Sequence, residues 1–63
     1  MRLSNGIELE ILKNDKVMFT KLINSKLYKL QANCKTVGVL GLLVKGISSY
    51  TNDEFVIEAE AVK

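Results

Sequence analysis

The sequence predicts a small all-β domain, built as a curled antiparallel sheet or a partly open barrel of four to five strands. Apolar and polar residues alternate over Ile7–Ile11 and again over Leu27–Ala32. The segment between them, Lys16–Ile23, is rich in side chains that favour strands. The chain has 63 residues, which is enough for a single domain over residues 1–63 with only a small core.

The first strand follows a turn at Ser4-Asn5-Gly6, because Asn and Gly tolerate a positive φ angle. Within Ile7–Ile11 the odd positions are apolar and both even positions are glutamates, which is the pattern of a strand with one buried face. We therefore expect Ile7, Leu9 and Ile11 to face the core. The polar pair Asn14-Asp15 then provides a hairpin connection to the second strand.

The second strand is Lys16–Ile23, and Asn24-Ser25 supplies the turn to a third strand at Leu27–Ala32. A helix capped by Asp15 is the competing interpretation, since several apolar residues also lie near the helical repeat. The turn residues in the middle of that stretch favour strands. The core side chains expected from the two strands are Val17, Phe19, Tyr28 and Leu30.

The second half of the chain is less regular. Thr36–Ile47 is apolar on both faces, which predicts a central strand covered twice, with a bulge or a close backbone approach at each of Gly38, Gly41 and Gly46. Glu54–Val62 fits a strand whose Phe55, Ile57, Ala59 and Ala61 face inward, and we favour that interpretation. A helix capped by Asn52 or Asp53 is the alternative.

The composition argues against catalysis. The chain has no histidine and one cysteine, Cys34, so the common general base, the common metal ligand and an internal disulfide are all missing. We expect no enzyme activity, no cofactor, no metal and no small-molecule substrate. A single free cysteine is typical of a reducing, intracellular compartment such as the cytoplasm. The longest apolar run, Val37–Val44, is too short to cross a membrane.

Lysines dominate the middle of the chain: seven of them lie between Lys13 and Lys45, against one acid, Asp15. Such an excess attracts nucleic-acid phosphates, and a tyrosine among lysines offers a stacking surface for an unpaired base. The plain alternative is a set of solvated lysines that keep strand edges soluble. The residues of the candidate nucleic-acid site are Lys13, Lys16, Lys21, Lys26, Tyr28, Lys29 and Lys35.

The stretch Leu9–Gly38, LEILKNDKVMFTKLINSKLYKLQANCKTVG, resembles the gag-pre-integrase segment of copia-type retrotransposon polyproteins. The similarity lies in the alternating first strand, the basic turn, the Val-rich second strand, the string Leu27–Gln31 and the later Thr36–Gly38. The sequence after Gly38 lacks the histidines that open the integrase of that family. The resemblance implies a non-catalytic structural segment of a parent polyprotein.

A domain with so small a core usually needs further burial, so we expect a homo-oligomer or a longer parent polypeptide. The alternative to the polyprotein segment is a free-standing small β-barrel protein, phage or bacterial in style. Such a protein binds a protein partner or single-stranded nucleic acid through its lysine-rich surface.

Overall fold

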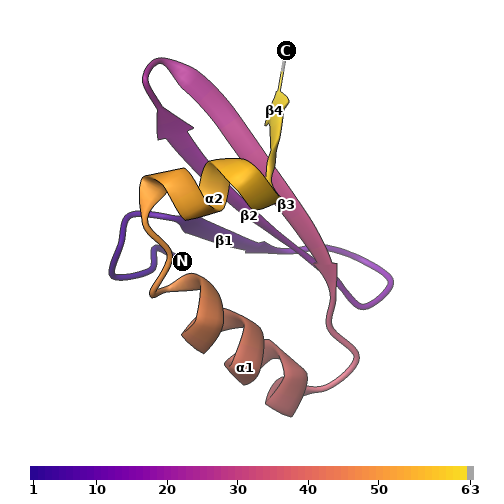
Figure 1. The fold of residues 1–63 in the computed structure, drawn as a ribbon. Coiled ribbons are helices and arrows are strands. Elements are labelled where there is room, and N and C mark those ends of the chain that lie inside the picture. Colours follow the sequence, from indigo (N-terminus) through magenta and orange to yellow (C-terminus); the bar gives the residue numbers. More distant parts are fainter. Residues whose placement is uncertain (63) are drawn as a thin grey trace.

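A computed structural model describes residues 1–62 of the chain. Four antiparallel strands form one sheet in the order β1-β2-β3-β4, and two helices stand between the last two strands in sequence (Figure 1). Because β1 and β4 lie at opposite edges, the sheet is open and does not close into a barrel. The elements are β1 (Glu8–Ile11), β2 (Lys16–Ile23), β3 (Lys26–Asn33), α1 (Val37–Ile47), α2 (Asn52–Glu58) and β4 (Glu60–Val62).

The first three strands form the meander that the sequence predicts. Leu9 pairs with Phe19, and Phe19 pairs with Leu30, so apolar side chains line up across the sheet. Both predicted connections are confirmed as turns with left-handed residues. The φ angles are 62° and 60° at Asn14-Asp15 and 51° and 66° at Asn24-Ser25.

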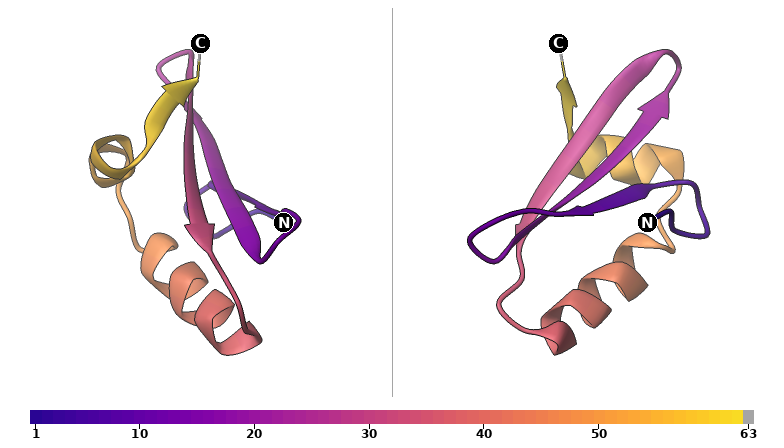
Figure 2. Two further views of the ribbon diagram at one scale, coloured as in Figure 1. Left: turned by 90° about the vertical axis from the view of Figure 1, so that its right-hand side faces the viewer. Right: turned by 180° about the vertical axis from the view of Figure 1, so that it is seen from behind.

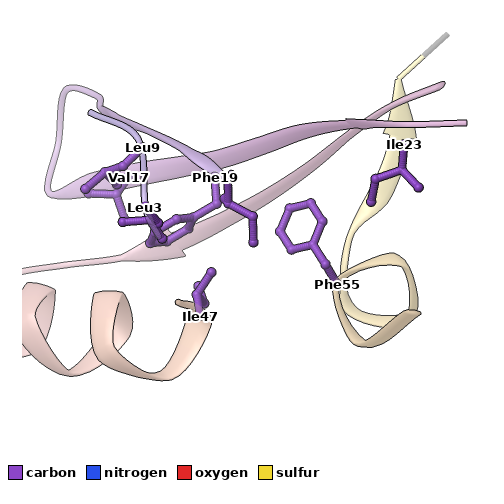
Figure 3. Close-up of a cluster of buried hydrophobic side chains, with 8 residues drawn as sticks. Leu3, Leu9, Val17, Phe19, Ile23, Ile47 and Phe55 are labelled. Atoms are coloured by element: carbon purple, nitrogen blue, oxygen red, sulfur yellow. The ribbon is translucent and has the colours of Figure 1, made fainter. Parts of the chain in front are cut away.

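The two helices cover one face of the sheet and leave the other face bare (Figure 2). The core lies between the sheet and the helices, with Phe19 from β2 and Phe55 from α2 both fully buried (Figure 3). Tyr28 and Leu30 of β3 are partly buried and pack against it, which confirms the expected period of two. The buried core residues are Leu3, Ile7, Leu9, Val17, Phe19, Ile23, Ile47 and Phe55.

The N-terminal segment covers the free edge of β1. The amino group of Met1 donates to the carbonyl of Leu9, at 3.0 Å, and the Leu9 amide donates to the carbonyl of Met1. Arg2 forms an ion pair of 2.8 Å with Glu8. Ile11, which the alternation directs toward the core, lies at the end of β1 and is 71% exposed.

The prediction of a central strand at Thr36–Ile47 is wrong, and so are the bulges or close backbone approaches expected at its glycines: the segment forms α1. Thr36 caps the helix, because its hydroxyl accepts a hydrogen bond of 3.2 Å from the Val39 amide. The side chains that reach the core, Leu40, Leu43, Val44 and Ile47, recur at the spacing of one helix face. That spacing is hidden in the sequence because the intervening positions are apolar as well.

The last segment divides into the helix α2 and the short strand β4, so each interpretation holds for one part of it. Thr51 caps α2, in place of the expected Asn52 or Asp53, through a reciprocal pair of hydrogen bonds with Glu54 of 3.2 and 3.0 Å. Ile57, expected to face inward, is 81% exposed on the helix. The fold is therefore mostly β with two short helices and is not strictly all-β.

Candidate functional site

The structure separates the seven residues of the candidate nucleic-acid site. Lys21 is held within the fold: its Nζ donates to the carbonyl of Asn5 at 2.8 Å and to Oδ1 of Asn52 at 2.6 Å. Asn5 in turn donates from Nδ2 to the carbonyls of Ile47 and Tyr50, at 2.9 and 3.0 Å, where α1 ends. Lys21 therefore joins β2 to the N-terminal turn and to α2.

Tyr28 lies on the helix-covered face of the sheet. It pairs with Lys21 of β2 and with Ala61 of β4, and its ring is partly buried against the core. The adjacent Lys29 projects from the bare face because neighbouring strand residues alternate. Tyr28 and Lys29 therefore do not form a joint surface for a stacked base.

Three candidate lysines gather at one end of the molecule. Lys16 and Lys35 line a hollow of about 390 Å³ between the first hairpin and the start of α1, and Lys13 belongs to that hairpin turn. Asp15 is the only acid among the lining residues. We call this hollow the basic cleft; its remaining lining residues are Ile11, Leu12, Asn14, Val17, Cys34, Thr36, Val37 and Leu40.

The other two candidate lysines are placed differently. Lys26 is exposed at the tip of the second hairpin. Lys29 pairs with Glu60 of β4 and lines a second hollow, of about 230 Å³, together with Glu58 and Glu60. These two acids offset the lysine charge there, so the basic character predicted from the sequence is concentrated at the basic cleft.

A surface that the sequence analysis missed lies on α1. The helix packs one side on the core, yet on its other side Leu42 is 72% exposed and Val39 39%. Its single charged residue is Lys45, in the last turn. Val39, Leu42 and Lys45 recur every three residues and so share the side of α1 that lies away from the core. We call these three exposed side chains the α1 face. The sequence concealed it, because a segment interpreted as a central strand was expected to be buried on both sides.

The exposed side of α2 has the opposite charge. Asp53, Glu54 and Glu58 are exposed there around Ile57, which is 81% exposed. We call these four residues the α2 face. The acids at Asp53 and Glu54 lie in the first helical turn, where the helix dipole stabilises negative charge. No basic residue lies in the last turn.

The bare face of the sheet carries a smaller apolar group near the second hairpin. Leu22 is 67% exposed, Leu27 41% and Val62 39%, and register pairing places them in one row across β2, β3 and β4. Both signs of charge flank that row, because Lys29 and Glu60 form the next one. The bare face of the sheet is therefore mostly polar, and its apolar area is confined to this one row near the second hairpin.

Little of the described chain suggests covalent chemistry. The Cys34 thiol is partly buried and donates to the Thr36 carbonyl at 3.4 Å. Within residues 1–62, no three Cys, Asp or Glu side chains come together as metal ligands. In the same range, neither helix has the length and apolar character needed to cross a membrane.

Comparisons with protein-family models, with curated proteins and with solved structures found no match to this chain.

Proposed function

We propose that this protein is a non-catalytic interaction module that binds a protein partner through the α1 face. The observation that carries the proposal is the composition of α1: ten of its eleven residues, VGVLGLLVKGI, are apolar or glycine. A helix that is apolar all round is normally buried on all sides. Here the side away from the core is exposed, so a partner that covers it would complete the burial.

The α1 face offers apolar side chains whose burial favours association. Fully burying a side chain such as Leu42 contributes about 1.5–3 kcal/mol, and Val39 adds further apolar area beside it. Interfaces usually depend on a few such central anchors surrounded by polar groups. Leu42, exposed at the middle of α1, has the position of an anchor.

The resemblance of Leu9–Gly38 to the gag-pre-integrase segment supports a role of the same kind, because that segment acts as a structural part of a polyprotein. Under this hypothesis the natural partner is another part of the parent chain. The free-standing alternative keeps the same binding face and assigns it a separate protein.

The test is cross-linking in extracts of cells that produce the protein, comparing Leu42→Glu with Leu22→Glu. The two leucines have similar exposure, 72% for Leu42 and 67% for Leu22, but Leu22 lies on the bare face of the sheet and Leu42 on α1, which covers the other face. Wild type and Leu22→Glu should give the same cross-linked species, and Leu42→Glu should lose them. Equal adducts from Leu42→Glu and wild type would contradict the proposal.

A second candidate function is contact with single-stranded nucleic acid at the basic cleft. The observation that favours it is the convergence of Lys16 and Lys35 on one hollow at the start of α1, where the helix dipole adds positive potential. Such contacts are sequence-tolerant and weaken steeply with salt. Oligonucleotide titrations at several salt concentrations test this function.

A further inference from the structure

We infer that the partner of the α1 face is a second copy of this chain, in a two-fold dimer where the α1 face of each copy packs on the α2 face of the other. The inference rests on the proposed function and identifies its partner. Three observations carry it: the extent of exposed surface, the charges of the two faces and the placement of the two helices.

The first observation is the surface area. The described chain exposes 4615 Å², whereas a compact monomer of 7.0 kDa exposes about 4,000 Å² by the usual scaling of surface with mass. The excess of about 600 Å² approaches the roughly 800 Å² that each partner buries in a standard interface. Pairing two copies would therefore bring the exposed surface into the ordinary range.

The second observation is charge complementarity. The only charge on the α1 face is positive, at Lys45, and the charges on the α2 face are all negative, at Asp53, Glu54 and Glu58. Each face also offers an exposed aliphatic side chain near its middle, Leu42 on α1 and Ile57 on α2. An α1–α2 contact therefore combines apolar burial with opposite charges, whereas an α2–α2 contact would set acids against acids.

The third observation is geometric. Both helices lie on the same side of the sheet, joined by the short segment between Ile47 and Asn52, and their outward faces point away from that sheet (Figure 2). A two-fold axis that lies parallel to this helical layer and passes between the two helices brings α1 over the partner's α2 and, by the same rotation, α2 over the partner's α1. The contact is made twice and closes at two copies.

The experiment is sedimentation equilibrium of the purified full chain over a range of concentrations, with charge reversal across the contact. Lys45 and Glu58 are suitable because both are exposed and Glu58 takes no part in the cap of α2. The variants are Lys45→Glu, Glu58→Lys and the double variant, with Lys13→Glu, in the first hairpin turn, as the matched control. Circular dichroism confirms that each variant keeps the wild-type fold.

We expect wild type and Lys13→Glu to form dimers with the same dissociation constant. Each single reversal should raise that constant about tenfold, since the pair occurs twice, and the double variant should return to within about threefold of wild type. A wild type that stays monomeric throughout overturns the inference. So does a double variant no tighter than the single ones.

The outcomes also separate this inference from the proposed function. If the protein is monomeric but Leu42→Glu still loses the cross-linked adducts in extracts, the dimer is excluded, while the α1 face is still supported as the binding site for another protein. If a dimer forms and Leu42→Glu leaves it intact, the α1 face itself is wrong as the site. A dimer that Leu22→Glu dissociates would place the contact on the bare sheet face and overturn the inference.

Discussion

Lys21 of β2 and Asn52, the first residue of α2, are joined by a hydrogen bond of 2.6 Å between Nζ and Oδ1. The same ammonium reaches the carbonyl of Asn5. The strand, the N-terminal turn and the second helix therefore meet at one lysine. A residue that the charge pattern suggested for nucleic-acid binding is a structural connection.

Replacing Lys21 by methionine should destabilise the protein by about 1–3 kcal/mol, because the Asn5 and Asn52 oxygens lose a charged donor. Urea unfolding followed by circular dichroism measures the change. The control is Lys29→Met, on the bare face of the sheet, where no such bond is lost and little change is expected. Equal effects of the two substitutions would show that the connection contributes nothing to stability.

Gly6 and Gly41 should respond oppositely to alanine. Gly6 has a φ angle of 88°, which an L side chain rarely adopts, so Gly6→Ala should destabilise by about 1 kcal/mol. Gly41 lies inside α1, and apart from the helix's own nearby backbone no atom lies within 4 Å of an added Cβ, so Gly41→Ala should stabilise by about 0.5–1 kcal/mol. Thermal unfolding of the two variants at equal concentration checks both signs.

The two helix caps should differ in strength. Thr51 and Glu54 satisfy each other's backbone amides, whereas Thr36 accepts a single bond from Val39. Thr51→Ala should therefore cost about 1–2 kcal/mol, and Thr36→Ala about 0.5–1 kcal/mol. Chemical unfolding curves give both values, and a larger loss at Thr36 would contradict the assignment.

Nucleic-acid contact, if it occurs at the basic cleft, should depend on Lys16 and Lys35. The double change Lys16→Gln/Lys35→Gln should weaken oligonucleotide binding and reduce the slope of log K against log salt by about 0.7 for each lysine. The matched control, Lys26→Gln/Lys29→Gln, removes the same charge elsewhere and should keep the wild-type slope. Identical slopes for the two double variants would exclude the cleft as the site.

The meander was predictable because its signals are local. Alternation assigns each strand a buried side, and the pairs Asn14-Asp15 and Asn24-Ser25 supply residues that accept left-handed backbone angles. Helix α1 was not predictable in the same way. Its core positions, such as Leu40 and Val44, have the helical spacing, but apolar neighbours remove the contrast on which periodicity depends.

The capping pair of α2 was present in the sequence as Thr51 and Glu54, a spacing typical of a helix start. The surfaces were harder to foresee. Whether a lysine is free or bound depends on partners far along the chain, as Lys21 shows through Asn5 and Asn52. The α1 face exists only because this segment is a helix, which exposes one side, and not the expected strand, which would be buried on both faces.

The order of the elements has a consequence for biosynthesis. The meander leaves the ribosome first, and its Phe19 stays uncovered until Phe55 of α2 has been translated. The edge of β3 that pairs with β4 stays unpaired still longer, because β4 (Glu60–Val62) is the last element to be translated. A nascent chain halted before α2 would therefore be a partly folded intermediate with exposed hydrophobic surface and an unpaired strand edge, the kind of species that chaperones recognise.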